Sequence, residues 1–73
     1  MTKLPAIKPK ELAKALGKLG FQSRPGKGSH VIFYRKDGKY ASIPMHPQPL
    51  GKGLLHKILK QVDINPEQLR ENL

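Results

Sequence analysis

A short glycine-rich turn that ends in a histidine is the part of this sequence best suited to chemistry. Residues 26–30 read Gly-Lys-Gly-Ser-His and run directly into the apolar segment 31–34. Glycines allow the backbone to approach a phosphate closely because they carry no Cβ, and Arg24 and Lys27 add positive charge. His30 has a side chain that can give and take a proton near neutral pH. At the mouth of a strand, this pattern predicts a small acid–base site for a phosphodiester, although basic proteins without activity also contain such turns.

Positive charge is spread over most of the sequence. The 73 residues hold 14 Lys and Arg against 5 Asp and Glu, which gives a formal net charge of +9. Glu11 and Asp37 are the acidic residues of the first 60 positions. Such a charge predicts a polyanion or an acidic protein as partner, the alternative being a solvated surface that only confers solubility. We expect no membrane partner, because no stretch combines a basic face with large exposed aromatics, and no apolar run approaches the ~20 residues of a membrane span.

The composition also limits the cofactors and the compartment. The sequence lacks cysteine, which excludes disulfides and cysteine-ligated zinc. Its three histidines and few acids show no metal-ligand spacing, so we expect neither a metal nor another cofactor. The first five residues lack the apolar core of a signal peptide, and we expect a cytoplasmic protein. A chain this short has a small core, so residues 1–73 are expected to form one domain with a broad, shallow binding surface.

Helical spacing near the N-terminus is shown by four apolar residues: Leu12, Ala15, Leu16 and Leu19. They predict a helix over residues 8–19, which Pro9 can begin and Gly20 can end. A second helix is predicted over 53–62 from Leu54, Leu55, Ile58, Leu59 and Val62. Asn65-Pro66 predicts the cap and first turn of a short third helix over 66–72, with Gln68 completing a capping box.

Three strand-like segments lie between the first two helices, at residues 21–24, 30–36 and 39–43. Asp37-Gly38 predicts a two-residue hairpin between the last two, and three prolines predict a loop over 44–51. The order predicts an α+β fold, a three-stranded antiparallel sheet with the helices on one face and the other open to solvent or a partner. This α-β-β-β-α(-α) arrangement is that of the double-stranded RNA-binding domain, so fold and charge both indicate RNA.

The motifs together resemble one family, the HicA-type toxins of bacterial and archaeal toxin–antitoxin systems. The resemblance is carried by Gly20-Phe21, Arg24, Gly28-Ser29-His30, Phe33, and the segments 43–46, 51–55 and 58–61. It implies an mRNA interferase, which is an endoribonuclease, held inactive by a HicB-type antitoxin that we expect to be acidic. The family's catalytic histidine maps onto His30. The sequence departs from the family at Val31, where many members carry a second histidine, and at 47–50, which lack the usual lysine and glutamate.

RNA supplies its own nucleophile, the 2′-OH, so cleavage needs no metal, and His30 is assigned as general base or acid. The residues expected to bind RNA are Arg24, Lys27, Gly28, Ser29 and Lys52. The second acid or base stays open between lysine, water and the RNA itself. Tyr34 and Tyr40 are expected to pack across strands more than to stack on bases.

Two histidines lie outside the glycine-rich turn. His46 is expected to be a structural loop residue, the alternative being a second catalytic role, and His56, off the apolar stripe of the second helix, is expected to be exposed. Two other classes of function remain open for the chain. One is a non-catalytic double-stranded-RNA-binding module, and the other is a protein-interaction domain for an acidic partner. A dependence of activity on His30 separates the toxin from the RNA-binding module, since phosphate binding needs no histidine.

Overall fold

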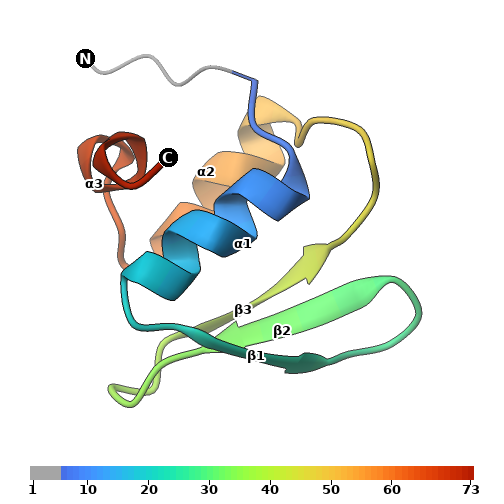
Figure 1. Ribbon diagram of the computed structural model, residues 1–73, viewed down its shortest axis with the longest axis horizontal. Helices are drawn as coiled ribbons and strands as arrows, with labels where there is room; N and C mark the ends of the chain where they lie inside the picture. The colour runs from blue at the N-terminus through green and yellow to red at the C-terminus, as the bar shows by residue number, and fades with distance from the viewer. Residues whose placement is uncertain (1–5) are drawn as a thin grey trace.

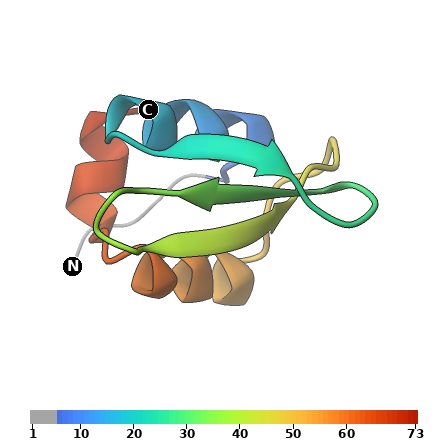
Figure 2. The same cartoon turned by 90° about the horizontal axis from the view of Figure 1, so that it is seen from below.

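The computed structural model describes residues 6–73, and the prediction about a signal peptide in the first five residues lies outside this part. The elements in chain order are α1 (Pro9–Lys18), β1 (Gln22–Pro25), β2 (His30–Tyr34), β3 (Tyr40–Pro44), α2 (Lys52–Gln61) and α3 (Pro66–Glu71). The strands form one antiparallel sheet in the order β1-β2-β3. Helices α1 and α2 lie on the same side of this sheet (Figure 1), and the other face is open (Figure 2). The expected double-stranded-RNA-binding-like α+β fold is confirmed.

The hydrophobic core lies between the two long helices and the sheet. Its largest fully buried apolar side chains include Ile7, Leu12, Leu16, Ile43, Ile58, Val62 and Leu69. Phe33 and Ala41 are the buried sheet residues that pair across β2 and β3. Because side chains alternate along a strand, the neighbours of these residues point to the open face.

One residue of the predicted apolar stripe of α2 is not in the core. Leu54 is 38% exposed and lines a hollow between α2 and β3. Helix α2 lies along the β3 edge of the sheet (Figure 2), so only part of its apolar face is covered by strands. Leu54 thus belongs to the apolar face of the helix without being buried, and its exposure leaves an apolar wall beside the edge strand.

The predicted helix ends are confirmed at both termini of the fold. Pro9 occupies the first turn of α1, and Glu11 accepts a hydrogen bond from the backbone N–H of Lys8 at 3.0 Å. Gly20 has a φ of +93°, which favours glycine, and the N–H of Phe21 donates to the carbonyl of Leu16 at 3.0 Å. At α3, Asn65 and Gln68 exchange two side-chain-to-backbone hydrogen bonds at 2.8 and 3.0 Å.

The β2–β3 hairpin differs from the predicted two-residue turn. Arg35 donates its N–H to the carbonyl of Lys39 at 2.9 Å, and Gly38, with φ +89°, donates to the carbonyl of Arg35 at 3.0 Å. The loop between Arg35 and Lys39 thus has three residues, and the flanking strands end at Tyr34 and begin at Tyr40. The Asp37 carboxylate explains this wider loop, since it accepts bonds from the N–H of Lys39 and from the Arg35 guanidinium.

Candidate nucleic-acid interface and acid–base site

The glycine-rich turn joins β1 to β2 and positions His30 at the first residue of the central strand. The N–H of Gly26 donates to the His30 carbonyl at 3.0 Å, and the His30 N–H donates to the Lys27 carbonyl at 3.0 Å. Gly28, at the tip, has a φ of +57°, which is the left-handed region. The turn is held to the rest of the fold by the N–H of Met45, which donates to the Ser29 carbonyl at 2.9 Å.

The imidazole of His30 is exposed and is oriented by its own turn. Its Nδ1 lies 3.3 Å from the Lys27 carbonyl oxygen. A carbonyl can only accept a hydrogen bond, so this contact favours the tautomer with the proton on Nδ1. In that tautomer the other ring nitrogen, Nε2, is the hydrogen-bond acceptor of the ring.

A hollow of about 370 Å³ lies beside His30, between the edge strand and α2. Its lining includes His30, Tyr40, Ser42, Pro44, Leu54, Lys57 and Gln61. Lys57 is a cation that the sequence motifs did not assign to the site. It stands far from the glycine-rich turn along the chain, and only the packing of α2 against β3 brings the two together. Lys52, which was predicted to bind RNA, is exposed at the start of α2. It does not line the hollow, whose α2 residues lie further along the helix.

The other predicted RNA-binding residues are exposed on the turn or on the open face. Arg24 lies in β1 and pairs with Ile32 across the sheet, while Lys27, Gly28 and Ser29 are exposed in the turn. The guanidinium of Arg24 is 5.9 Å from the ring centroid of Tyr34, within the range of a cation–π contact. Lys27, Gly28 and Ser29 therefore share the turn with His30, whereas the Arg24 guanidinium lies on the open face toward the other end of β2.

The hairpin at the far end of the sheet has its own ion pair. Arg35 and Asp37 are joined at 2.8 Å. The hydrogen bond from Arg35 lowers the pKa of the Asp37 carboxyl and raises the pKa of the guanidinium. The pair stabilises the folded state at pH values above the ordinary pKa of an aspartate. This stabilisation is lost as the pH falls through the lowered pKa of Asp37. At neutral pH the charge of Asp37 is thus matched by Arg35.

The other two histidines lie outside the hollow that contains His30. His56 is exposed on α2, as predicted, and lines a separate depression with Asp63 and Asn65. His46 is half-buried in the loop after β3, and its Nδ1 is enclosed without a hydrogen-bond partner. Within residues 6–73, no three histidine, cysteine, aspartate or glutamate side chains lie close enough together to hold a metal ion. No helix in this part of the chain is both long and apolar enough to cross a membrane.

Gly26 is expected to be needed for the position of His30. A Cβ at this residue would lie 3.0 Å from the His30 carbonyl oxygen and 3.3 Å from Cγ1 of Ile32. Gly26→Ala must therefore push the first residue of β2 away, and we expect about 1–3 kcal/mol of destabilisation, the range for overpacking. Thermal or urea unfolding followed by circular dichroism measures this change.

A matched control for this substitution is Gly17→Ala in α1, where a Cβ meets no atom within 4 Å. Alanine is favoured over glycine in a helix by about 0.8–1.0 kcal/mol, so this variant should be more stable than the parent. If both substitutions changed the free energy of unfolding by the same amount and in the same direction, the close packing around Gly26 would be contradicted.

Comparison with known families assigns most of the chain to one family. The model of the family described as the HicA toxin of bacterial toxin–antitoxin systems matches residues 9–64, which include the sheet, the glycine-rich turn and α2. No curated protein matches the chain. Because the family model covers more than half of the sequence, the chain belongs to the HicA toxin family, whose members act as toxins of toxin–antitoxin pairs.

Proposed function

We propose that this toxin is a metal-independent endoribonuclease that cleaves mRNA with His30 as general base. The observation that supports it best is the exposed His30 imidazole, whose Nδ1 faces the Lys27 carbonyl at 3.3 Å. This leaves Nε2 to accept a proton beside a hollow that also contains Lys57. A non-catalytic RNA-binding module has no need for a histidine oriented in this way.

In the proposed reaction, Nε2 of His30 takes the proton of an RNA 2′-OH. The 2′ oxygen then attacks the adjacent phosphorus, and the bond from phosphorus to the 5′ oxygen breaks. The products are a 2′,3′-cyclic phosphate and a 5′-hydroxyl, and the leaving oxygen takes its proton from Lys57 or from water. A positioned base or acid of this kind contributes typically about 10²–10⁴-fold to the rate.

Charge on the phosphate oxygens is stabilised by cations and N–H groups around the turn. Lys27 is exposed on the same turn as His30, Arg24 is exposed on the neighbouring strand β1, and Lys57 lines the hollow. Gly28 and Ser29 offer backbone N–H groups without a bulky side chain at the tip. Preorganised donors of this type act on charge that develops in the transition state.

We propose that the inhibitor is an acidic HicB-type antitoxin that covers the open face and the turn around His30. The hollow beside His30 is shallow and bordered by exposed side chains. Such a site is blocked by covering it, and opposite charge speeds capture. Co-purification with the product of the neighbouring gene, followed by protection mapping at His30, tests this assignment. Protection confined to α3, with His30 still open to modification, would contradict it.

RNA cleavage by the purified toxin is expected to persist in excess EDTA. The 2′-OH is the nucleophile in this mechanism, so DNA of the same sequence should remain intact. The products should carry cyclic phosphate or 3′-phosphate ends, which resist ligation until any cyclic ester has been opened with acid and the phosphate removed with a phosphatase. Gel analysis of an end-labelled RNA measures both features.

The same assay distinguishes the mechanism from a hydrolytic one. A metal-dependent nuclease that activates water commonly leaves 3′-hydroxyl ends and stops when the metal is removed. Activity lost in EDTA and restored by Mg²⁺, or 3′-hydroxyl products, would refute the proposed chemistry. A parallel sample with 2′-O-methyl RNA provides the control, since this RNA lacks the nucleophile and should remain uncut.

A further inference from the structure

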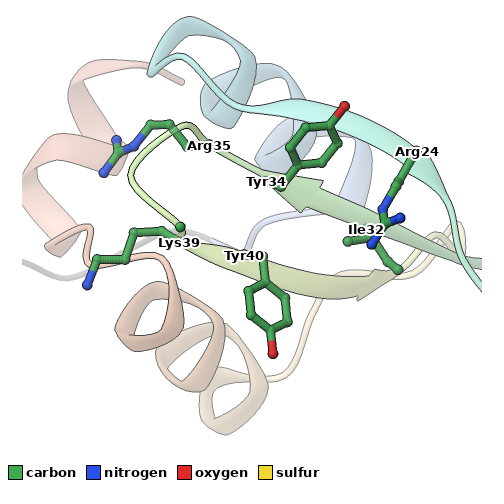
Figure 3. Close-up of a pocket in the computed structure, with 7 residues that line it drawn as sticks. Arg24, Ile32, Tyr34, Arg35, Lys39 and Tyr40 are labelled. Atoms are coloured by element: carbon green, nitrogen blue, oxygen red, sulfur yellow. The ribbon is translucent and has the colours of Figure 1, made fainter.

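A second hollow, of about 620 Å³, lies on the open face of the sheet, and the proposed cleavage reaction does not use it. Its walls come from Arg24 of β1, Ile32 and Tyr34 of β2, and Lys39 and Tyr40 at the start of β3. Figure 3 shows the two tyrosine rings on this face, one directed toward β1 and the other toward α2. Tyr34 and Tyr40 are direct partners in the β2–β3 register.

The two tyrosines are unusually available for contact. Tyr40 is 67% exposed although it lies in a strand, and Tyr34 is 36% exposed. The Tyr34 hydroxyl donates to Oε1 of Gln22 at 3.1 Å, which fixes the orientation of the ring. Exposed aromatic rings on a sheet face are stacking surfaces for unpaired bases. The prediction that these residues mainly pack across strands therefore does not describe Tyr40, because most of its surface faces solvent.

The charge of this hollow fits a nucleic acid. Among the described residues, its lining holds three cations and no carboxylate. Arg35 is engaged by Asp37 and lies 4.6 Å over the Phe21 ring. Arg24 lies 5.9 Å over the Tyr34 ring, and Lys39 is the third cation of the lining. Cations next to aromatic rings match the alternation of phosphates and bases in a single strand.

The hollow shares one lining residue, Tyr40, with the hollow beside His30. His30 and Tyr34 are the two ends of β2, and strand geometry places them about 13 Å apart. A strand bound to the tyrosines can thus present a nearby phosphate to His30.

We propose that the open face binds single-stranded RNA, with an unpaired base stacked on Tyr40 and a second on Tyr34, next to the phosphate that is cleaved. This inference rests on the proposed function, which it extends by naming the substrate as unpaired RNA. It differs from recognition of a duplex, whose bases are stacked on each other and present no free faces.

Binding of a fluorescein-labelled 2′-O-methyl oligoadenylate, measured by anisotropy, tests the proposal without cleavage. Tyr40→Ala should weaken binding roughly 5- to 150-fold, the range for one stacked base, and Tyr40→Phe should bind like the parent. A ribose-phosphate oligomer of equal length without bases should bind more weakly, and Tyr40→Ala should not weaken it further. Lys39→Ala should weaken both probes, whereas Lys14→Ala, on the exposed side of α1, should affect neither.

Three results would overturn the proposal: oligoadenylate binding that is unchanged in Tyr40→Ala, an equal weakening of the base-free probe, or a preference for duplex RNA regardless of Tyr40. If Tyr40→Ala weakened only the binding of the acidic antitoxin, the face would be a protein interface instead. These results are independent of the cleavage assay, so a toxin that binds through Tyr40 but fails to cut RNA would contradict the proposed reaction alone.

Discussion

His30→Ala is expected to lower RNA cleavage by about 10²–10⁴-fold, the contribution of a positioned general base or acid, and to abolish growth inhibition. The variant should fold normally, since the imidazole is exposed and its hydrogen bond is to the Lys27 carbonyl of its own turn, at 3.3 Å. Cleavage of an end-labelled RNA by the purified protein measures the effect, and thermal unfolding verifies the fold. Added imidazole should restore part of the rate, because it can enter the exposed site left by the side chain.

His56→Ala is the matched control for this experiment. His56 is also an exposed histidine, but it lies on α2 in a different depression from the one that contains His30. Its replacement should leave both cleavage and toxicity unchanged. Full toxicity of a well-expressed His30→Ala protein would contradict the assignment of the general base and would favour the RNA-binding module.

The fold could be predicted well because its signals are local. Pro9, Gly20 and Asn65 determine helix ends through their own backbone and side-chain chemistry, and each acts as predicted. The predicted hairpin was wrong by one residue, because Asp37-Gly38 is typical of a two-residue turn while the Asp37 carboxylate stabilises a wider loop with Arg35. The loop length therefore depends on the side-chain interaction between Asp37 and Arg35, which the residue preferences of turns do not predict.

The site could be predicted only in the part that is continuous in sequence. The glycine-rich turn and His30 are neighbours along the chain, so their spacing was informative. Lys57 and Tyr40 share a hollow with His30 because α2 packs along the edge strand β3. The spacing of residues along the chain does not predict this packing. The exposure of Leu54 has the same origin, since the apolar spacing of a helix indicates one face but not how far a sheet covers it.

Charge reversal at Arg24 and Lys27 is expected to weaken RNA binding at least about 100-fold at low salt. Hydrogen bonds to charged groups are worth about 1.5–3 kcal/mol each, and the double variant removes two of them and introduces repulsion. The dependence of log affinity on log salt should also become shallower, by roughly 0.7 for each phosphate of a single strand that the protein no longer neutralises. Anisotropy titrations of the 2′-O-methyl oligoadenylate over a range of salt concentrations measure both quantities.

The control is the double reversal of Lys10 and Lys14, which changes the net charge equally but lies on the exposed side of α1. If the long-range field alone attracted RNA, both double variants would show a similar decrease in affinity, because net charge acts without regard to position. A contact site at the turn predicts a large decrease only for the Arg24 and Lys27 variant. If the antitoxin is acidic, as proposed, it should show the same contrast in its association rate, which should fall toward the ~10⁵–10⁶ M⁻¹s⁻¹ of unsteered encounters. Unchanged capture by the antitoxin, together with weakened RNA binding, would show that the antitoxin docks away from the turn.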